Sequence, residues 1–145
     1  MISNSSEYIG KLLQQAFRGF ASQMHKHLRA AGYSDLTPTL AEMLATIPQN
    51  GIRIIALAQA FGITKQAASE AIRQLQKNGY LHKDMDPYDA RSVLIRLSPR
   101  GKQFMYDAHA MKAAIEAEYT QALGSANFDQ LQQHLKALIN LQSKP

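Results

Sequence analysis

The residues best suited to recognise another molecule lie on one side of the segment from Lys65 to Asn78. At 100° per residue, this segment would place polar groups on one helical face and apolar groups on the other. Its amide, guanidinium and carboxylate groups are those that hydrogen-bond to the edges of adenine, guanine and cytosine. The outward set is Gln66, Glu70, Arg73, Gln74 and Lys77, with Lys65, Ala67 and Ser69 at its margins, and the inward set is Ala68, Ala71, Ile72 and Leu75.

The sequence around this segment favours DNA recognition over the alternative, an ordinary solvated helix face of similar charge. Gly62 permits the positive φ of a tight turn between two helical patterns, and Thr64 is a good N-cap for the second helix. After Gly79, two alternating patterns at 80–85 and 92–97 read as strands, joined by strong turn residues from Asp86 onward. Helix, tight turn, helix and β-hairpin in this order predict a winged helix-turn-helix.

The tip of the predicted hairpin carries a second candidate contact. Arg91 lies where a wing can place a guanidinium into the narrow, electronegative minor groove of DNA. Asp89 projects to the same side of an extended chain and can hold Arg91 in position. Alternatively, the pair only stabilises the turn, as a surface contact worth about 0–1 kcal/mol. Arg53 and Lys77 are better suited to phosphate contacts, which position a protein without specifying sequence.

Charge is concentrated in the same region. Between Thr64 and Lys102 there are eight basic and four acidic residues, a net +4 out of +5 for the 145-residue chain. Net charge alone admits nucleic acid or an anionic membrane as partner. A membrane-surface role is disfavoured because the basic residues lie on a turn motif and a hairpin and do not line one long amphipathic helix.

Helical segments outside this region carry apolar stripes. One helix is expected from about Glu7 to Ala31, with capping-box spacing between Asn4 and Glu7 and Gly32 at its end. Its stripe is Ile9, Leu13, Ala16, Phe17, Phe20, Met24 and Leu28. Further helices are expected after Thr37-Pro38, from about Arg53 to Phe61, after Ser98-Pro99 to about Leu123, and from near Asn127.

The two C-terminal helices are predicted to bury stripes of their own. These comprise Phe104, Ala108, Met111, Ile115 and Ala122 in one helix and Phe128, Leu131, Leu135, Leu138 and Leu141 in the other. A small winged domain cannot cover three such helices, which predicts a dimerisation platform built from both termini. A monomeric helical bundle is the alternative. The expected fold class is mainly α (α+β).

Composition excludes several kinds of function. The chain has no cysteine, which removes disulfides, thiolate metal sites and thiol chemistry. No apolar run reaches the roughly 18–20 residues of a membrane span, and the N-terminus lacks a secretory pattern, so a soluble cytoplasmic protein is expected. No nucleophile–base arrangement, phosphate loop or paired-carboxylate motif appears. We therefore expect no enzyme and no cofactor.

These residues resemble a known family along nearly the whole chain. Leu57-Ala58 with Gly62-Ile63-Thr64, then Leu75 with Asn78-Gly79-Tyr80-Leu81, then the run from Asp86 to Ser92, and finally Leu97-Ser98 with Gly101 are similar to the MarR family of transcriptional regulators. The Asp-x-Arg motif of the wing, at Asp89 and Arg91, is a specific signal in this context.

The resemblance implies a homodimer that binds a pseudopalindromic operator in double-stranded DNA. Residues 1–35 and 99–145 would form the helical dimerisation region, and residues 36–98 the winged DNA-binding region. It also implies a regulatory pocket between these regions, often for small phenolic or anionic compounds. The predicted DNA-contacting residues are Arg53, Thr64, Lys65, Gln66, Ser69, Glu70, Arg73, Gln74, Lys77, Asp89 and Arg91.

Glu70 departs from the family, which commonly has a basic or neutral residue at this position. Phosphates repel a carboxylate, so Glu70 either reads a cytosine, pairs with Arg73 or Gln74, or rejects other bases. A winged-helix adaptor that binds protein instead of DNA is the competing interpretation. A ligand-responsive repressor is the favoured one.

The histidines do not indicate a metal site. His25 and His27 lie two apart on different sides of a helix and do not form an i, i+4 pair, although two helices can bring His25 close to His109. His25 and Arg29 can instead line an anion pocket near Tyr33. Their alternative role is that of solvated residues on the helix face.

Overall fold

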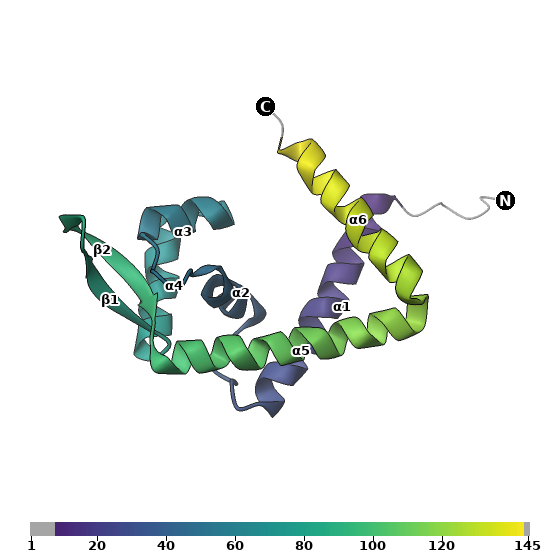
Figure 1. Cartoon of the computed structure of the whole chain (residues 1–145), viewed down its shortest axis with the longest axis horizontal. Coiled ribbons are helices and arrows are strands. Elements are labelled where there is room, and N and C mark those ends of the chain that lie inside the picture. Colours follow the sequence, from purple (N-terminus) through teal and green to yellow (C-terminus); the bar gives the residue numbers. More distant parts are fainter. Residues whose placement is uncertain (1–7, 144–145) are drawn as a thin grey trace.

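One long helix, α5 (Pro99–Leu123), runs from the winged part of the molecule, residues 36–98, to the terminal helices α1 and α6 (Figure 1). The computed structural model describes residues 8–143. A small two-stranded sheet and a group of short helices lie at the start of α5, and α6 follows its end. The other elements are α1 (Ile9–Ala30), α2 (Pro38–Thr46), α3 (Ile54–Phe61), α4 (Lys65–Lys77), β1 (Leu81–Asp86), β2 (Asp89–Leu97) and α6 (Ser125–Gln142).

Local capping chemistry sets where the helices begin, as the sequence predicts. The hydroxyl oxygen of Thr37 accepts the N–H of Leu40 at 3.2 Å, and that of Ser98 accepts the N–H of Gly101 at 3.1 Å. In both cases proline follows the cap, at a position where its missing N–H leaves no bond unmade. The expected capping box of Asn4 and Glu7 lies outside the described residues.

The β-hairpin is tighter than the sequence indicates. β1 and β2 pair antiparallel from Leu81–Leu97 to Met85–Val93, and after a register shift the last pair is Asp86–Asp89. Only Pro87 and Tyr88 remain as the turn, whereas the expected loop extended to residue 91. The reason is that Asp86 and Asp89 each accept a main-chain N–H two residues later, which lets the chain reverse quickly.

The core lies between the winged elements and the first two-thirds of α5. Leu57, Ile72, Leu75, Ile95 and Phe104 are almost completely shielded from solvent. The predicted inward face of α4 is therefore confirmed, including Ala68. The predicted stripe of α5 is buried as far as Ile115, but Ala122 is exposed because the winged part does not extend that far along the helix.

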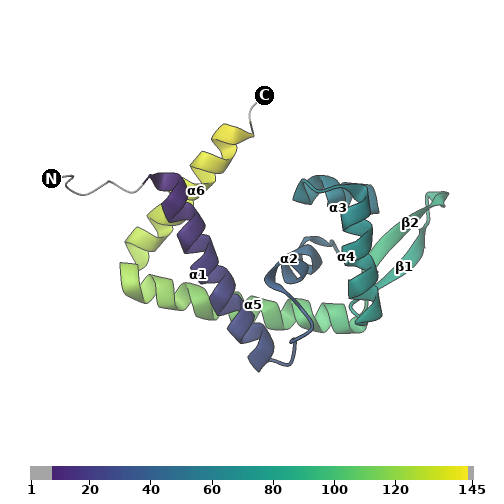
Figure 2. The ribbon, with the colours of Figure 1, turned by 180° about the vertical axis from the view of Figure 1, so that it is seen from behind.

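The terminal helices bury much less of their apolar surface. α1 crosses α5, and only Met24 and Leu28 of α1 are buried (Figure 2). No residue of α6 is buried. The large apolar side chains exposed on these two helices are Ile9, Leu12, Leu13, Phe17, Leu131, Leu138, Ile139 and Leu141. In the single chain, the predicted stripes of both helices are thus largely uncovered.

Candidate nucleic-acid interface

The turn before α4 has the geometry that the sequence predicts. Gly62 adopts a left-handed conformation with φ of 61°, and its N–H closes the end of α3 on the carbonyl of Gln59. The hydroxyl oxygen of Thr64 then caps α4 by accepting the N–H of Ala67 at 3.0 Å. Ile63 packs against the core between them. Because these contacts are local, they fix the direction in which α4 leaves the turn.

The outward face of α4 is available to a partner. Lys65, Gln66, Gln74 and Lys77 are all exposed, and Ser69 at the margin is half-buried. The structure thus brings together on one surface the helix residues that the sequence assigns to DNA. Thr64 is exposed too, but its hydroxyl oxygen already serves as the helix cap.

Glu70 is paired within α4. Its carboxylate lies 2.5 Å from Nη1 of Arg73, one turn further along the helix, and both side chains are about 70% exposed or more. Of the roles that the sequence left open for Glu70, the isolated chain adopts the pair with Arg73. Such an exposed pair contributes only about 0–1 kcal/mol to stability. Its main effect is to offset the negative charge of Glu70 on the outward face of α4 and to restrict the orientation of the Arg73 guanidinium.

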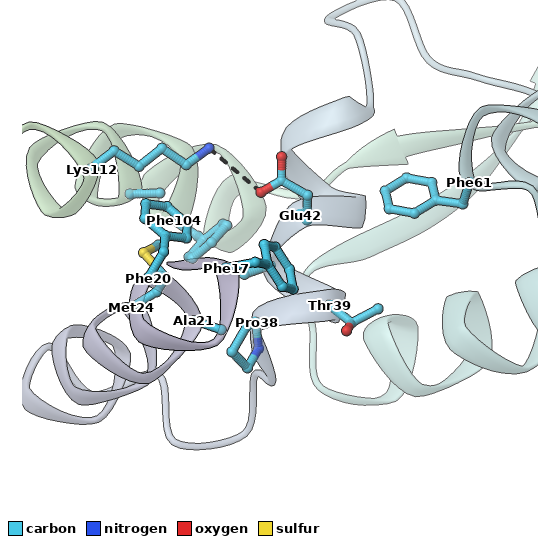
Figure 3. A pocket seen from close by; sticks show the side chains of 12 residues that line it. Phe17, Phe20, Ala21, Met24, Pro38, Thr39, Glu42, Phe61, Phe104 and Lys112 are labelled. Atoms are coloured by element: carbon cyan, nitrogen blue, oxygen red, sulfur yellow. Dashed lines mark ion pairs between the residues drawn. The ribbon is translucent and has the colours of Figure 1, made fainter. Parts of the chain in front are cut away.

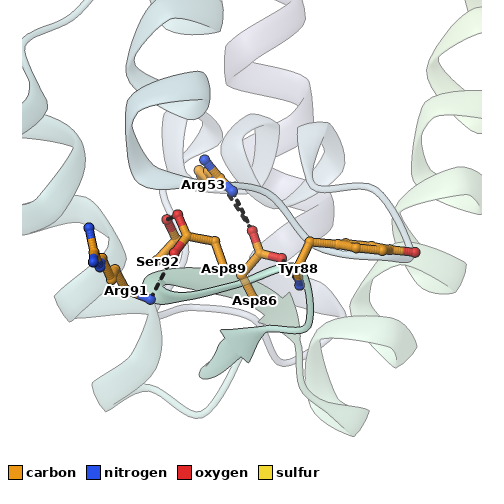
Figure 4. Close-up of polar contacts among 6 residues, drawn as sticks. All are labelled: Arg53, Asp86, Tyr88, Asp89, Arg91 and Ser92. Carbon is orange, nitrogen blue, oxygen red and sulfur yellow. Dashed lines mark hydrogen bonds and ion pairs between the residues drawn. The ribbon is translucent and has the colours of Figure 1, made fainter.

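The contacts of Asp89 differ from those the sequence suggested. Its carboxylate accepts the main-chain N–H of Arg91 at 3.0 Å and the hydroxyl of Ser92 at 3.1 Å (Figure 4). Asp89 therefore orders the backbone that carries Arg91 and leaves the guanidinium exposed. Figure 4 shows the Arg91 and Tyr88 side chains extending in opposite directions from the hairpin. An exposed cation at a hairpin tip is suited to insertion into a minor groove.

Arg53 fixes the wing to the start of α3. Its Nη2 lies 2.5 Å from Oδ2 of Asp86, and Nε lies 3.2 Å from the same oxygen. The other carboxylate oxygen of Asp86 accepts the N–H of Tyr88 at 2.9 Å. That main-chain bond and the Arg53 guanidinium hold the pKa of Asp86 below its usual range, although burial opposes them. Arg53 is still half-exposed, so the ion pair does not remove it from solvent.

The anchoring role of Asp86 escaped the sequence interpretation, which treated it only as a turn residue. Thirty-three residues separate it from Arg53, so no local spacing rule connects the two. The available signal was the Asp-Pro-Tyr run itself, because an aspartate at this place commonly accepts a main-chain N–H two residues on. The ion pair with Arg53 needs the folded arrangement.

An apolar pocket of about 440 Å³ lies where α1, α2 and α5 meet (Figure 3). The rings of Phe17, Phe20 and Phe104 form much of its wall. Lys112 and Glu42 contribute the charged groups of the lining, and their side chains approach to 3.9 Å. Other lining residues are Ala21, Met24, Pro38, Thr39, Ala41, Phe61 and Ala108.

The residues expected to line an effector pocket are not part of this one. His25 and Arg29 lie on exposed positions of α1, because the pocket uses the helical face of residues 17, 20, 21 and 24. Tyr33 is buried, and its hydroxyl donates to a carboxylate oxygen of Asp107. Burial and this bond raise the pKa of Tyr33 to about 12. Helical phase could have identified the phenylalanine wall, but those residues were assigned to the core.

Within residues 8–143, no three histidine, aspartate or glutamate side chains gather in a way that could hold a metal ion. The possible meeting of His25 and His109 does not produce such a group. None of the helices in this part of the chain is long and apolar enough to cross a membrane.

The sequence of the winged part matches a known family. Residues 36–93, which run from just before α2 to the middle of β2, match the model of the MarR family. The transcriptional regulator HosA of Escherichia coli O111:H- is 25% identical over 107 residues, which cover 73% of this chain and 79% of HosA. The winged part of the chain is therefore similar to the MarR family of transcriptional regulators.

Solved structures share the whole fold. FabT of Streptococcus pneumoniae, in complex with DNA, superposes with a TM-score of 0.80 at 14% identity, covering 92% of this chain and 94% of FabT. CouR of Rhodococcus jostii RHA1, bound to p-coumaroyl-CoA, has a TM-score of 0.76 at 21% identity and covers 94% of each chain. At these identities the likeness establishes the winged fold together with its terminal helices.

Proposed function

We propose that the protein is a cytoplasmic, homodimeric repressor that binds a pseudopalindromic operator and releases it when a small molecule binds. The observation that carries this proposal is the exposed, polar outer face of α4 beside a wing whose tip presents Arg91. FabT, which shares this fold, was solved in complex with DNA, and this supports DNA as the partner. A protein-binding adaptor has no comparable observation in its favour.

The uncovered apolar surface supports the proposed homodimer. Side chains on α1 and α6 such as Phe17, Ile139 and Leu141 are more than 60% exposed in the single chain. Contiguous apolar surface of this kind is characteristic of interaction sites. Pairing the terminal helices of two copies would bury it. The same pairing would place two α4 helices on one side of the dimer, with half-sites centred roughly 10 bp apart.

Each polar residue of the interface then has a proposed role. Gln66, Arg73 and Gln74 read base edges, with Glu70 restraining Arg73. Arg91 enters the minor groove, and Asp89 orders the backbone that carries it. The phosphate contacts are assigned to Lys65, Lys77, Ser69 and the half-exposed Arg53. Thr64 acts indirectly, through the N-terminal turn of α4.

The pocket at the junction of α1, α2 and α5 is the proposed effector site. Its phenylalanine side chains suit a ligand with an aromatic or branched apolar group, and Lys112 can pair with a carboxylate or phenolate of that ligand. Phe61, one of its lining residues, immediately precedes Gly62 of the turn that leads to α4. A ligand that moves Phe61 therefore acts next to the start of the recognition helix. CouR, of the same fold, was solved with p-coumaroyl-CoA bound.

A gel-shift titration with the DNA upstream of the protein's own gene tests the DNA-binding function. We expect a discrete complex that survives excess bulk DNA and whose affinity falls steeply with salt. A selection from random duplexes serves as a second substrate in case the gene does not regulate itself. If the protein prefers no sequence in either experiment over bulk DNA, the proposal is wrong.

Effector release is tested separately with small aromatic carboxylates and phenols. A compound that dissociates the operator complex should lose its effect in Lys112→Met, which removes the cation but keeps an apolar side chain of similar length. Lys136→Met on α6, an exposed lysine away from the pocket, is the matched control. Equal responses of both variants and the unaltered protein would place the effector elsewhere.

A further inference from the structure

The C-terminal end of α4 is joined directly to the first turn of α5. The hydroxyl of Ser98 donates to the carbonyl of Gly79 at 2.5 Å, and its main-chain N–H donates to the carbonyl of Tyr80 at 2.9 Å. A Cβ on Gly101 would lie only 2.3 Å from that Tyr80 carbonyl oxygen. Because the two backbones touch without an intervening side chain, there is no room for α4 to slide along α5 at this point.

Arg100 adds a second layer to this joint. Its Nη1 donates to the carbonyl of Asn78, the C-cap residue of α4, and its guanidinium carbon lies 4.2 Å from the centroid of the Tyr80 ring. Its Nη2 lies 3.4 Å from Oδ2 of Asp35. One arginine thus contacts the end of the recognition helix, the residue that follows it and the α1–α2 connection. A cation is also favourable at a helix C-terminus, where unpaired carbonyls carry partial negative charge.

Buried tyrosines continue the joint into the long helix. The hydroxyl of Tyr80 donates to Oδ1 of Asp35 at 2.7 Å, and that of Tyr33 donates to Asp107 of α5. The rings of Tyr33 and Tyr80 each pack edge-on against the ring of Phe104, with centroids 5.2 and 6.2 Å away. The two tyrosine rings are tilted against each other at 6.3 Å. The end of α4, the segment after α1 and the first turns of α5 are therefore held as one unit.

We infer that Arg100 is a positioning residue that fixes the angle between α4 and α5 and so sets the half-site spacing that the dimer accepts. This inference rests on the proposed function, in which two α4 helices read two half-sites. Each α4 is connected to the dimer through this joint and α5. Adding one base pair between half-sites moves the next site by about 3.4 Å along the DNA and by roughly 35° around it. Only a stiff joint can discriminate against such a change.

The test compares Arg100→Met with Lys102→Met. Both variants remove one positive charge from the first turn of α5, and both positions are exposed, but no contact like those of Arg100 joins Lys102 to α4. Methionine keeps an apolar chain on the Tyr80 ring. Arg100→Lys is the third variant, because lysine retains charge without the planar, multiply donating guanidinium. Dimer mass and thermal midpoint are measured first to confirm that each variant folds.

Affinity is then measured on a selected operator and on versions with one or two base pairs inserted or deleted between the half-sites. The unaltered protein and Lys102→Met should both prefer one spacing. Arg100→Met should bind the preferred spacing about fivefold more weakly, with little further loss on the shifted operators, so that its spacing profile is flatter. Arg100→Lys should lie between them.

Two results would overturn the inference while leaving the proposed function intact. In one, Arg100→Met keeps the full spacing preference. In the other, it weakens all spacings equally and lowers the salt slope by about 1, as expected for a lost phosphate contact. If the unaltered protein binds no DNA sequence specifically, the proposed function fails, and this inference fails with it. The three outcomes are distinguishable in the same set of titrations.

Discussion

The winged part of the molecule and its terminal helices, α1 and α6, differ in how much of their apolar surface a single chain buries. The helices of the winged part bury their apolar faces. Capping residues, Asx turns and the Arg53–Asp86 ion pair provide hydrogen-bond partners for polar groups in this part. By contrast, α6 buries no residue at all, and the N-terminal half of α1 is exposed. The proposed recognition surface is therefore complete within one chain, whereas the proposed placement of two such surfaces on DNA would require a second copy.

The largest effect is expected from a charge on the uncovered helix. Ile139→Asp would place a carboxylate on an apolar surface of α6 that is 61% exposed in the single chain. If a second copy covers this surface, dimers should dissociate and operator affinity should fall by roughly 100-fold or more, because a buried unpaired charge costs several kcal/mol. Light scattering and gel shift measure the two effects. Gln133→Asp, on the same helix, is the control, and equal behaviour of the two variants would contradict the dimer surface.

A smaller loss is expected at the wing. Arg91→Ala should weaken specific binding roughly tenfold and reduce the salt slope by about 1, because one cation leaves the DNA. The thermal midpoint should not change, since the guanidinium is exposed and the carboxylate of Asp89 accepts the main-chain N–H of Arg91 and the hydroxyl of Ser92. Fluorescence anisotropy at several salt concentrations measures both quantities. Unchanged affinity and slope would remove Arg91 from the interface.

Thr64→Ala tests whether the winged part is stabilised locally. The N–H of Ala67 would lose its acceptor at the start of α4, at a cost of about 1 kcal/mol. For a chain of this size the thermal midpoint should fall by about 2–4 °C. Calorimetry measures the shift, and Thr64→Ser, which keeps the hydroxyl, should recover most of it. A dimer mass unaffected by either substitution would confirm that the cap serves α4 alone.

A last effect is confined to alkaline solution, outside the conditions of the DNA-binding experiments. Tyr33 retains its proton in the folded chain up to a pKa of about 12, because burial and Asp107 both oppose the phenolate. The unfolded chain loses that proton near pH 10, so the contribution of Tyr33 to stability is complete below pH 10 and declines between about 10 and 12. Urea unfolding across this range measures the decline. Tyr33→Phe should reduce the slope, and an identical slope would exclude this role.

Sequence reasoning succeeded where the chemistry is local. Thr37-Pro38, Gly62, Thr64 and Ser98-Pro99 determine helix boundaries through contacts with residues at most a few positions away. The inward face of α4 follows from helical phase alone. For the same reason the hairpin was predicted, but its turn length was not, because that length depends on which main-chain groups Asp86 and Asp89 accept.

Contacts between distant residues could not be predicted in this way. Tyr33 and Asp107 are 74 residues apart, and no periodicity indicates that they meet. Ala122 belongs to the same apolar stripe as Ile115 but lies beyond the covering elements, which only the folded length of α5 reveals. The apolar pocket was not predicted for a related reason, because phenylalanines on α1 that line a pocket look like core residues in the sequence.

The exposed face of α4 has a consequence for which substitutions the chain can accept. Gln66 and Gln74 are exposed, so substitutions there need not disturb folding, and under the proposed function they would alter operator preference. Gly101 allows no such freedom, since any side chain would collide with the carbonyl of Tyr80. Under the proposed function, substitutions on the outward face of α4 would change the DNA sequence that is preferred, while the contact between Gly101 and Tyr80 must be kept.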